Sequence, residues 1–189
     1  MLSEPFRVIT EDSHIRVAEL DDIPSIIAFY HSNQEHFATF SDLKPTEFYT
    51  EEYWIQEIKK REVQFKLRSE CKLFIFSLDQ KKIMGFCNFF NVMRGAFDAC
   101  FLGYGLSEAA VGRGLMQKSL TVSCEAIFRN WNLHRIMANY DPENKKSENT
   151  LGAVGFVKEG YARDYLYYHG KWHDHVMTSL INKNWKMSS

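Results

Sequence analysis

The segment from Phe101 to Met116 has the residue types and spacing that could hold a phosphate. It begins as an apolar run, continues through a loop containing Gly112 and Gly114, and ends where an amphipathic pattern starts. The first amides of a helix have no acceptor within the helix, and the helix dipole adds partial positive charge there. Glycines lack the β-carbon that would keep an anion away from these amides. The spacing therefore predicts a main-chain anion site over Val111–Met116.

The glycine pattern does not fit two common nucleotide-binding motifs. A P-loop needs GxxxxGK[ST], and a dinucleotide fingerprint needs GxGxxG. Here Gly112 and Gly114 are followed by Met116 and Gln117, with no third glycine. A tight turn between a strand and a helix would use the same two glycines, so this simpler interpretation stays open.

A second polar motif, His173-Asp174-His175, places two imidazoles on one face of a strand because strand side chains alternate. A zinc site usually needs three or four ligands, and no further Cys or His stands at ligand spacing. We therefore expect no metal site, and we expect the motif to join the strands of a hairpin. The aromatic residues around it are expected to pack and to line a substrate groove rather than to stack on bases.

These residues need a mixed α/β framework to position them. Apolar runs separated by turn residues predict strands, helical spacing follows the glycine loop, and Gly155 is placed as a helix C-cap. The expected strands cover residues 14–17, 72–78, 83–91, 97–106, 135–140, 157–168 and 175–181. The expected helices are one near residues 23–30, one long amphipathic helix over 46–69, one over 112–130 and a short one over 147–154.

The composition indicates one globular domain over residues 1–189. The chain has 23 basic and 24 acidic side chains, so general electrostatic attraction to nucleic acid is not expected. No apolar run approaches the roughly 20 residues of a membrane span, and the first residues lack a secretory signal pattern. The four cysteines lie far apart in apolar stretches, as buried thiols in a reducing compartment would. We expect a cytoplasmic protein, either a monomer or a homodimer.

Several segments together resemble the GNAT acyl-CoA N-acyltransferases. They are NFFNVMRGAFDACFLGYGLSE (88–108), VGRGLM (111–116), LHRIMANYDPENKKS (133–147) and GFVKEGYARDYLYYHGKWHDHVMTSL (155–180). Within that superfamily the chain is most similar to the RimJ/RimL-type ribosomal-protein N-terminal acetyltransferases, and to their RimJ branch. The likeness is dense over residues 83–181, whereas the first 80 residues follow the family only in element order. Ala109 stands where the superfamily usually has Arg or Gln, so phosphate contact there would fall to main-chain amides.

The resemblance implies an α/β single-domain GNAT fold with a mixed, mostly antiparallel sheet, a splayed central pair of strands and helices on both faces. It also implies acetyl-CoA as cosubstrate, lying in the splay. The residues implied to bind it are Tyr104, Gly105 and Leu106 for pantetheine, Val111, Gly112, Arg113, Gly114, Leu115 and Met116 for the pyrophosphate, and Asn144 and Ser147 near the thioester. Lys145 and Lys146 would be near the nucleotide 3′-phosphate, although a solvated turn is the simpler interpretation of this pair.

The implied reaction is attack of a protein N-terminal α-amine on the acetyl thioester. The RimJ likeness points to the N-terminal alanine of protein five of the small ribosomal subunit. About one tenth of such amines is deprotonated at neutral pH, so a modest base is sufficient. Ser147 is implied to protonate the leaving thiolate, and a main-chain amide near Gly105 would stabilise the oxyanion. The candidate bases are Asp98 and Glu35, followed by His134.

Other interpretations stay open at this point. A strand-edge aspartate such as Asp98 is usually solvated, and His134 would favour the C-terminal end of a helix for electrostatic reasons alone. The acceptor could be a small amine, such as an amino acid, a polyamine or an antibiotic, instead of a protein. The chain could also be a non-catalytic acyl-CoA-binding ribosome-assembly factor that has only the cofactor site.

Overall fold

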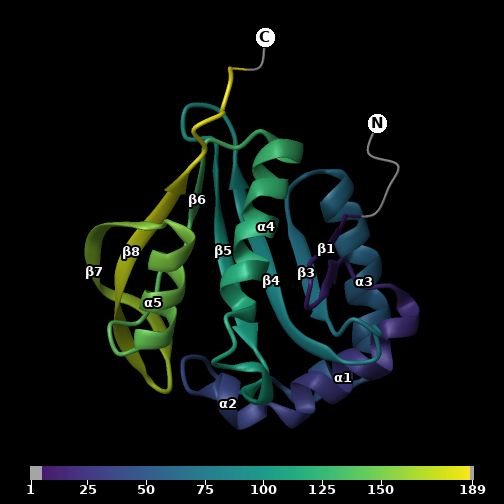
Figure 1. Ribbon diagram of the computed structural model, residues 1–189. Helices are drawn as coiled ribbons and strands as arrows, with labels where there is room; N and C mark the ends of the chain where they lie inside the picture. Colours follow the sequence, from purple (N-terminus) through teal and green to yellow (C-terminus); the bar gives the residue numbers. More distant parts are fainter. Residues whose placement is uncertain (1–5, 188–189) are drawn as a thin grey trace.

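A single mixed sheet runs through the whole of the described chain, which is residues 6–187 of a computed structural model (Figure 1). Its strands lie in the order β1-β2-β3-β4-β5-β6-β8-β7, and only β5 and β6 run parallel. The strands are β1 (Arg7–Ile9), β2 (His14–Arg16), β3 (Cys71–Phe76), β4 (Ile83–Met93), β5 (Ala99–Leu106), β6 (Arg135–Met137), β7 (Val157–Tyr168) and β8 (Lys171–Ile181). Residues 1–5 and 188–189 of the expected domain lie outside the described part.

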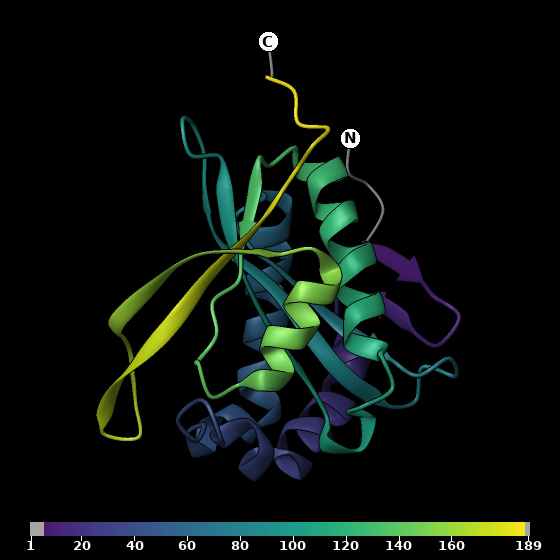
Figure 2. The ribbon, with the colours of Figure 1, turned by 60° about the vertical axis from the view of Figure 1, so that its left-hand side comes forward.

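Helices cover both faces of this sheet. They are α1 (Ile23–Ser32), α2 (Gln34–Ala38), α3 (Glu51–Lys66), α4 (Leu115–Trp131) and α5 (Lys145–Val154), with short 3-10 turns η1 (Leu20–Asp22), η2 (Thr46–Tyr49) and η3 (Glu108–Ala110). Side chains of β3 alternate between the two cores: Leu73 and Ile75 pack with α4, whereas Phe74 and Phe76 pack with α1 and α3. Figure 2 shows α4 and α5 side by side on one face, so the mostly antiparallel sheet with helices on both faces is confirmed.

The central strands separate as the resemblance implied. β5 and β6 pair only between Ala99–Phe101 and Arg135–Met137. β5 continues to Leu106 with β4 as its single sheet partner. The chain after β6 follows β8 instead, because the amides of Ala138 and Tyr140 donate to main-chain carbonyls of that strand. One edge of β5 is therefore left without a strand partner near its C-terminal end.

The expected long helix over residues 46–69 is wrong. Thr50 has an extended backbone (φ −97°, ψ 152°), and its hydroxyl accepts a hydrogen bond from the Tyr53 amide as the N-cap of α3. Pro45 precedes η2, which ends at Tyr49. The apolar spacing hides this break because Phe48 and Trp54 pack in the same core on either side of it. The sequence signals also missed β1 and α2, and β6 ends three residues before the expected strand does.

Candidate functional site

The loop between β5 and α4 has the geometry that the two glycines predict. Gly112 has φ +87° and Gly114 has φ +71°, a left-handed region that side chains with a β-carbon rarely adopt. No atom lies within 4 Å of where a β-carbon would stand on either residue. The loop is therefore built on glycine conformations and opens onto free space, which is what a main-chain anion site requires.

Helix α4 presents its first amides to this space. The amide of Lys118 is the first to bond back along the chain, to the Gly114 carbonyl at 3.1 Å. The amides of Leu115, Met116 and Gln117 have no acceptor within the helix. The Leu115 and Met116 side chains are buried in the core, so these residues offer their main chain only. The residues of this loop fit the pyrophosphate of coenzyme A without a lysine at the motif.

A pair of hydroxyls bridges the splay between β5 and α5. The Tyr104 Oη and the Ser147 Oγ lie 2.5 Å apart. Asn144 is the N-cap of α5, and its side-chain oxygen accepts a hydrogen bond of 3.0 Å from the Ser147 amide. The predicted start of this helix at Ser147 is therefore wrong, because α5 begins two residues earlier, at Lys145. Burial raises the pKa of Tyr104, so the phenol is protonated at neutral pH and can donate a hydrogen bond.

Helix α2 lies against β5 at Gly105. A β-carbon on Gly105 would be 3.1 Å from the Phe37 ring and 3.0 Å from the Phe86 ring, so a larger residue here would push these rings aside. Glu35 precedes Phe37 by two residues and so points to roughly the opposite side of α2. It is exposed and lines a hollow of about 650 Å³ with Asp42 and other residues. The structure therefore places Glu35 on α2 but facing away from Gly105.

Asp98 and His134 lie at the other end of β5. The Asp98 carboxylate accepts hydrogen bonds from Trp185 Nε1 (2.8 Å) and Arg94 Nη1 (3.0 Å). Its carbonyl accepts the His134 amide at 2.8 Å. Gly105 is the seventh residue after Asp98 along the strand, which is about 23 Å at the usual rise. The structure does not bring these two candidate bases to the glycine loop.

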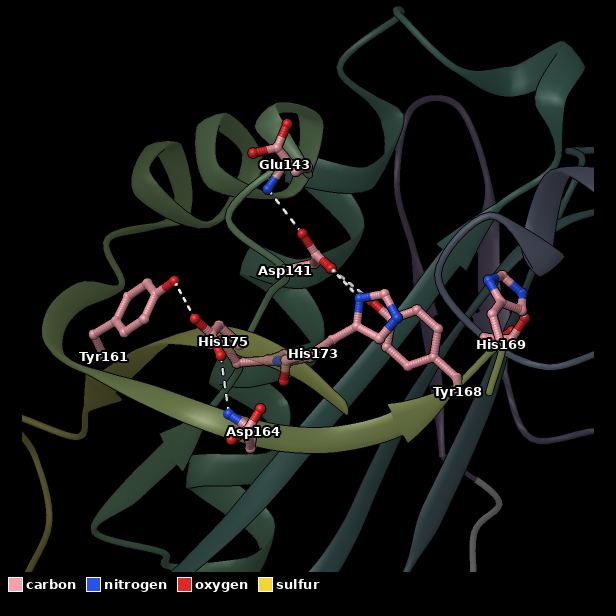
Figure 3. A network of polar contacts seen from close by, with 10 residues as sticks. Asp141, Glu143, Tyr161, Asp164, Tyr168, His169, His173 and His175 are labelled. Carbon is pink, nitrogen blue, oxygen red and sulfur yellow. Dashed lines mark hydrogen bonds and ion pairs between the residues drawn. The ribbon is translucent and has the colours of Figure 1, made fainter. Parts of the chain in front are cut away.

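A polar network that sequence reasoning did not assemble lies beyond β6, between α5 and the β7–β8 hairpin (Figure 3). The buried Asp141 carboxylate accepts the Tyr168 hydroxyl at 2.5 Å and the Glu143 amide at 2.9 Å, and it lies 3.3 Å from His173 Nδ1. The His173 ring stacks on Tyr168 at 3.6 Å. Burial would raise the pKa of Asp141, but hydrogen bonds from Tyr168 and Glu143 and the nearby imidazoles outweigh it, and the pKa is lowered.

The predicted hairpin role of the His173-Asp174-His175 motif holds for its central residue. Asp174 on β8 accepts hydrogen bonds from the Tyr161 hydroxyl (2.7 Å) and the Asp164 amide (2.9 Å) on β7. His173 instead crosses to Asp141, a residue that is distant in sequence and carries no spacing signal. One sequence signal could have pointed to Asp141. It lies three residues before Asn144, in a segment that carries the family resemblance.

The network forms part of the wall of a groove of about 480 Å³. Thr39 and Phe40, which follow α2, form one side, and the β7–β8 hairpin forms the other. Within residues 6–187, no three His, Cys, Asp or Glu side chains are arranged to hold a metal ion. No helix in that same range is long and apolar enough to cross a membrane.

Comparison with known proteins gives a consistent result. The acetyltransferase (GNAT) domain model matches residues 14–157. The [ribosomal protein uS5]-alanine N-acetyltransferase of Escherichia coli is 49% identical over 111 residues, which span 59% of this chain and only 57% of that protein. The crystal structure of a ribosomal-protein-S5-alanine acetyltransferase from Vibrio fischeri superposes with a TM-score of 0.92 at 34% identity, covering 96% of this chain and all of that one. RimJ of Mycobacterium smegmatis, solved with a coenzyme A disulfide, has the same fold at 23% identity, with a TM-score of 0.84 over 98% of this chain and 89% of its own.

Proposed function

Because the chain belongs to the acetyltransferase (GNAT) family, we propose that it transfers the acetyl group of acetyl-CoA to a protein N-terminal α-amine. The proposed acceptor is the N-terminal alanine of ribosomal protein uS5, as the names of two of the relatives above suggest. The observation that carries the proposal is the unpaired edge of β5 ending in an open, glycine-built helix start. An acceptor of this kind would place the protein in the cytoplasm.

The donor would lie along the splay. The main chain of Tyr104–Leu106 is free on one edge and would pair with the pantetheine amides, while the amides of Val111–Met116 would hold the pyrophosphate. Arg113 is exposed beside that loop and would add a charged contact. Of the lysine pair, Lys145 forms an ion pair with Glu148 at 3.1 Å, so Lys146 is the freer candidate for the 3′-phosphate.

The chain's own groups would then serve the transfer. Bound acetyl-CoA supplies an activated thioester. The amide of Tyr104 or Leu106, on either side of Gly105, points away from β4 and would stabilise the developing oxyanion, because it is fixed in the sheet before the reaction starts. The Tyr104–Ser147 hydroxyl pair would give a proton to the departing sulfur. Fixing both reactants in attack geometry contributes a large part of the acceleration, up to about 7–11 kcal/mol in intramolecular models.

The proposal is tested with purified protein, acetyl-CoA and a panel of acceptors followed by mass spectrometry. We expect the peptide with the uS5 N-terminus to gain one acetyl group at its α-amine and to react faster than amino acids, polyamines or aminoglycosides. Equal turnover of the small amines would overturn the protein-acceptor assignment. Binding of acetyl-CoA with no acetylation of any acceptor would instead indicate a non-catalytic acyl-CoA-binding protein.

A further inference from the structure

The proposed reaction lacks a base, because Asp98, His134 and Glu35 do not reach Gly105. We propose that His173 is this base, that Asp141 and Tyr168 position it, and that the acceptor amine meets it in the groove of about 480 Å³. The inference rests on the proposed function and adds a catalytic residue to it.

The network lies across the splay from the transfer site. The last paired residues of the two parallel strands are Phe101 and Met137, and Gly105 and Asp141 follow them on the two segments that separate there. These segments meet again at the hydroxyl pair of Tyr104, next to Gly105, and Ser147, in the helix that follows Asp141. The wall of the groove also reaches Gly105, because α2 contacts this residue and then continues into groove-lining residues. The groove therefore opens beside the strand end where the acetyl group would lie.

The imidazole of His173 is fixed in the arrangement that a general base needs. One ring face stacks on Tyr168 with an interplanar angle of 9°, and Nδ1 lies 3.3 Å from the Asp141 carboxylate. A proton on Nδ1 therefore faces a carboxylate, which leaves Nε2 with a free lone pair. Nε2 is covered from solvent and has no hydrogen-bond partner in the described chain. Such an atom costs free energy when it stays unpaired, and an acceptor ammonium that displaces the side chains covering it would satisfy it.

Each proton released in the proposed acetyl transfer has an acceptor. The α-ammonium of the acceptor gives one proton to His173 Nε2, and Asp141 stabilises the imidazolium that results. The nitrogen then bonds to the acetyl carbon as the carbon–sulfur bond breaks. The Tyr104–Ser147 pair protonates the sulfur and recovers a proton from the new amide nitrogen. The products are the acetylated N-terminus, the thiol of coenzyme A and an imidazolium that returns its proton to water.

The test is the pH dependence of kcat/KM for the uS5 N-terminal peptide in His173→Asn, whose amide keeps a donor toward Asp141. At pH 7 we expect a loss of about 10–100-fold. The loss should shrink to less than about threefold at pH 9.5, where the α-amine, with a pKa near 8, is already deprotonated. The charged or titratable groups that line the groove with His173 are Asp141, Glu143, Tyr161, Tyr168, Lys171 and Asp174, and His175 adds a charge near Asp141. His134→Asn, which removes an imidazole at the far end of β5, is the control and should keep the wild-type profile.

A second variant keeps the proposal testable if His173→Asn does not fold. Tyr168→Phe keeps the stacked ring and removes one donor to Asp141, so the carboxylate holds the imidazolium more strongly. We expect the apparent pKa of the kcat/KM profile to rise, with acetyl-CoA affinity unchanged in calorimetry. A deficit that is equal at all pH values, or no shift in Tyr168→Phe, would overturn the role of His173. If wild-type protein binds acetyl-CoA but acetylates no N-terminus, the proposed function fails first.

Discussion

The two ends of β5 hold their polar groups in opposite ways. At the N-terminal end, the Asp98 carboxylate accepts hydrogen bonds on both oxygens from Arg94 and Trp185, and β6 pairs with the strand. At the C-terminal end, the strand loses β6, and the loop after it has glycines that face open space. Polar groups at the N-terminal end are therefore already bonded to other parts of the chain. Groups at the second end are left free, and free backbone donors in a fixed position are what a ligand needs.

This difference teaches that residue type alone does not mark a catalytic group. An aspartate on a central strand has the right chemistry for a base, yet its partners decide whether it can serve. Asp98 ties β5 to the C-terminal segment through Trp185. Asp141 is also well bonded, but one of its partners is an imidazole with a free nitrogen beside a groove. The two carboxylates therefore differ in their partners, because only Asp141 has a partner with an unpaired nitrogen atom.

The largest effect is expected from Gly112→Val at the open end. A branched residue is strained at φ +87°, and its side chain would occupy the free space in front of the α4 amides. We expect acetyl-CoA affinity to fall by at least about 100-fold in calorimetry, which is about 2.7 kcal/mol. The matched control is Gly95→Val in the turn before β5, where φ is +86° and no neighbour lies within 4 Å. The control should lose similar stability and keep the affinity, and equal affinity in both variants would contradict the placement of the pyrophosphate.

A smaller effect on turnover should follow from the hydroxyl pair. Ser147→Ala leaves the main chain of the splay unchanged, so acetyl-CoA affinity should be kept within about threefold while kcat falls by about 10–100-fold. Tyr104→Phe should give a similar loss, and the double variant should lose little more, because two groups that act as one unit are not additive. Ser119→Ala, which removes a buried hydroxyl with no partner on α4, is the control. Additive losses would show that the two hydroxyls act separately.

Much of the fold was predictable because its signals are local. The glycines at 112 and 114, the apolar face of α4 and the C-cap at Gly155 depend on a few consecutive residues, and the structure has all of them. The break at Thr50 was not predictable, because apolar spacing continues across it and a single threonine is a weak signal. The cofactor side of the site is similarly local, since Tyr104–Met116 is one continuous segment.

The acceptor side depends on long-range contacts and was missed for that reason. His173 meets Asp141 because β8 pairs with the chain after β6 through the bridge between Tyr140 and Val176. The periodicity of a sequence does not reveal which distant segments pair in this way. Glu35 shows the same limit at short range, because the face of α2 that it occupies depends on how Phe37 packs.

At the closed end of β5, Asp98→Ala should change stability and not activity. The substitution leaves the half-buried Trp185 indole without its acceptor, and the loss of such a hydrogen bond costs about 0.5–1.5 kcal/mol. We expect the free energy of unfolding in urea to fall by about that amount while kcat per folded molecule stays the same. Asp98→Asn should lose less, because asparagine tolerates φ +42° and keeps one acceptor oxygen. A drop in kcat at full folding would return Asp98 to the list of candidate bases.

The smallest effect concerns Asp141 in acid. Its folded-state pKa is lowered although burial opposes this, because hydrogen bonds from Tyr168 and Glu143 and the nearby imidazoles favour the carboxylate. A lowered pKa contributes stability that is present above the unfolded pKa of about 4 and is lost as the pH falls through the folded value. The difference in unfolding free energy between wild type and Asp141→Asn should therefore be constant above about pH 5 and shrink below about pH 4.

The control for this acid effect is Glu62→Gln on α3. The pKa of Glu62 is also lowered, by a hydrogen bond from Lys66, but both side chains are exposed. Salt screens an exposed pair of this kind, whereas the donors to Asp141 belong to the folded structure. At 0.5 M NaCl the Glu62→Gln difference should vanish while the Asp141→Asn difference persists. If salt removed both stability differences, the Asp141 carboxylate would be stabilised by exposed charges instead of fixed hydrogen bonds. The network could then not fix the orientation of His173.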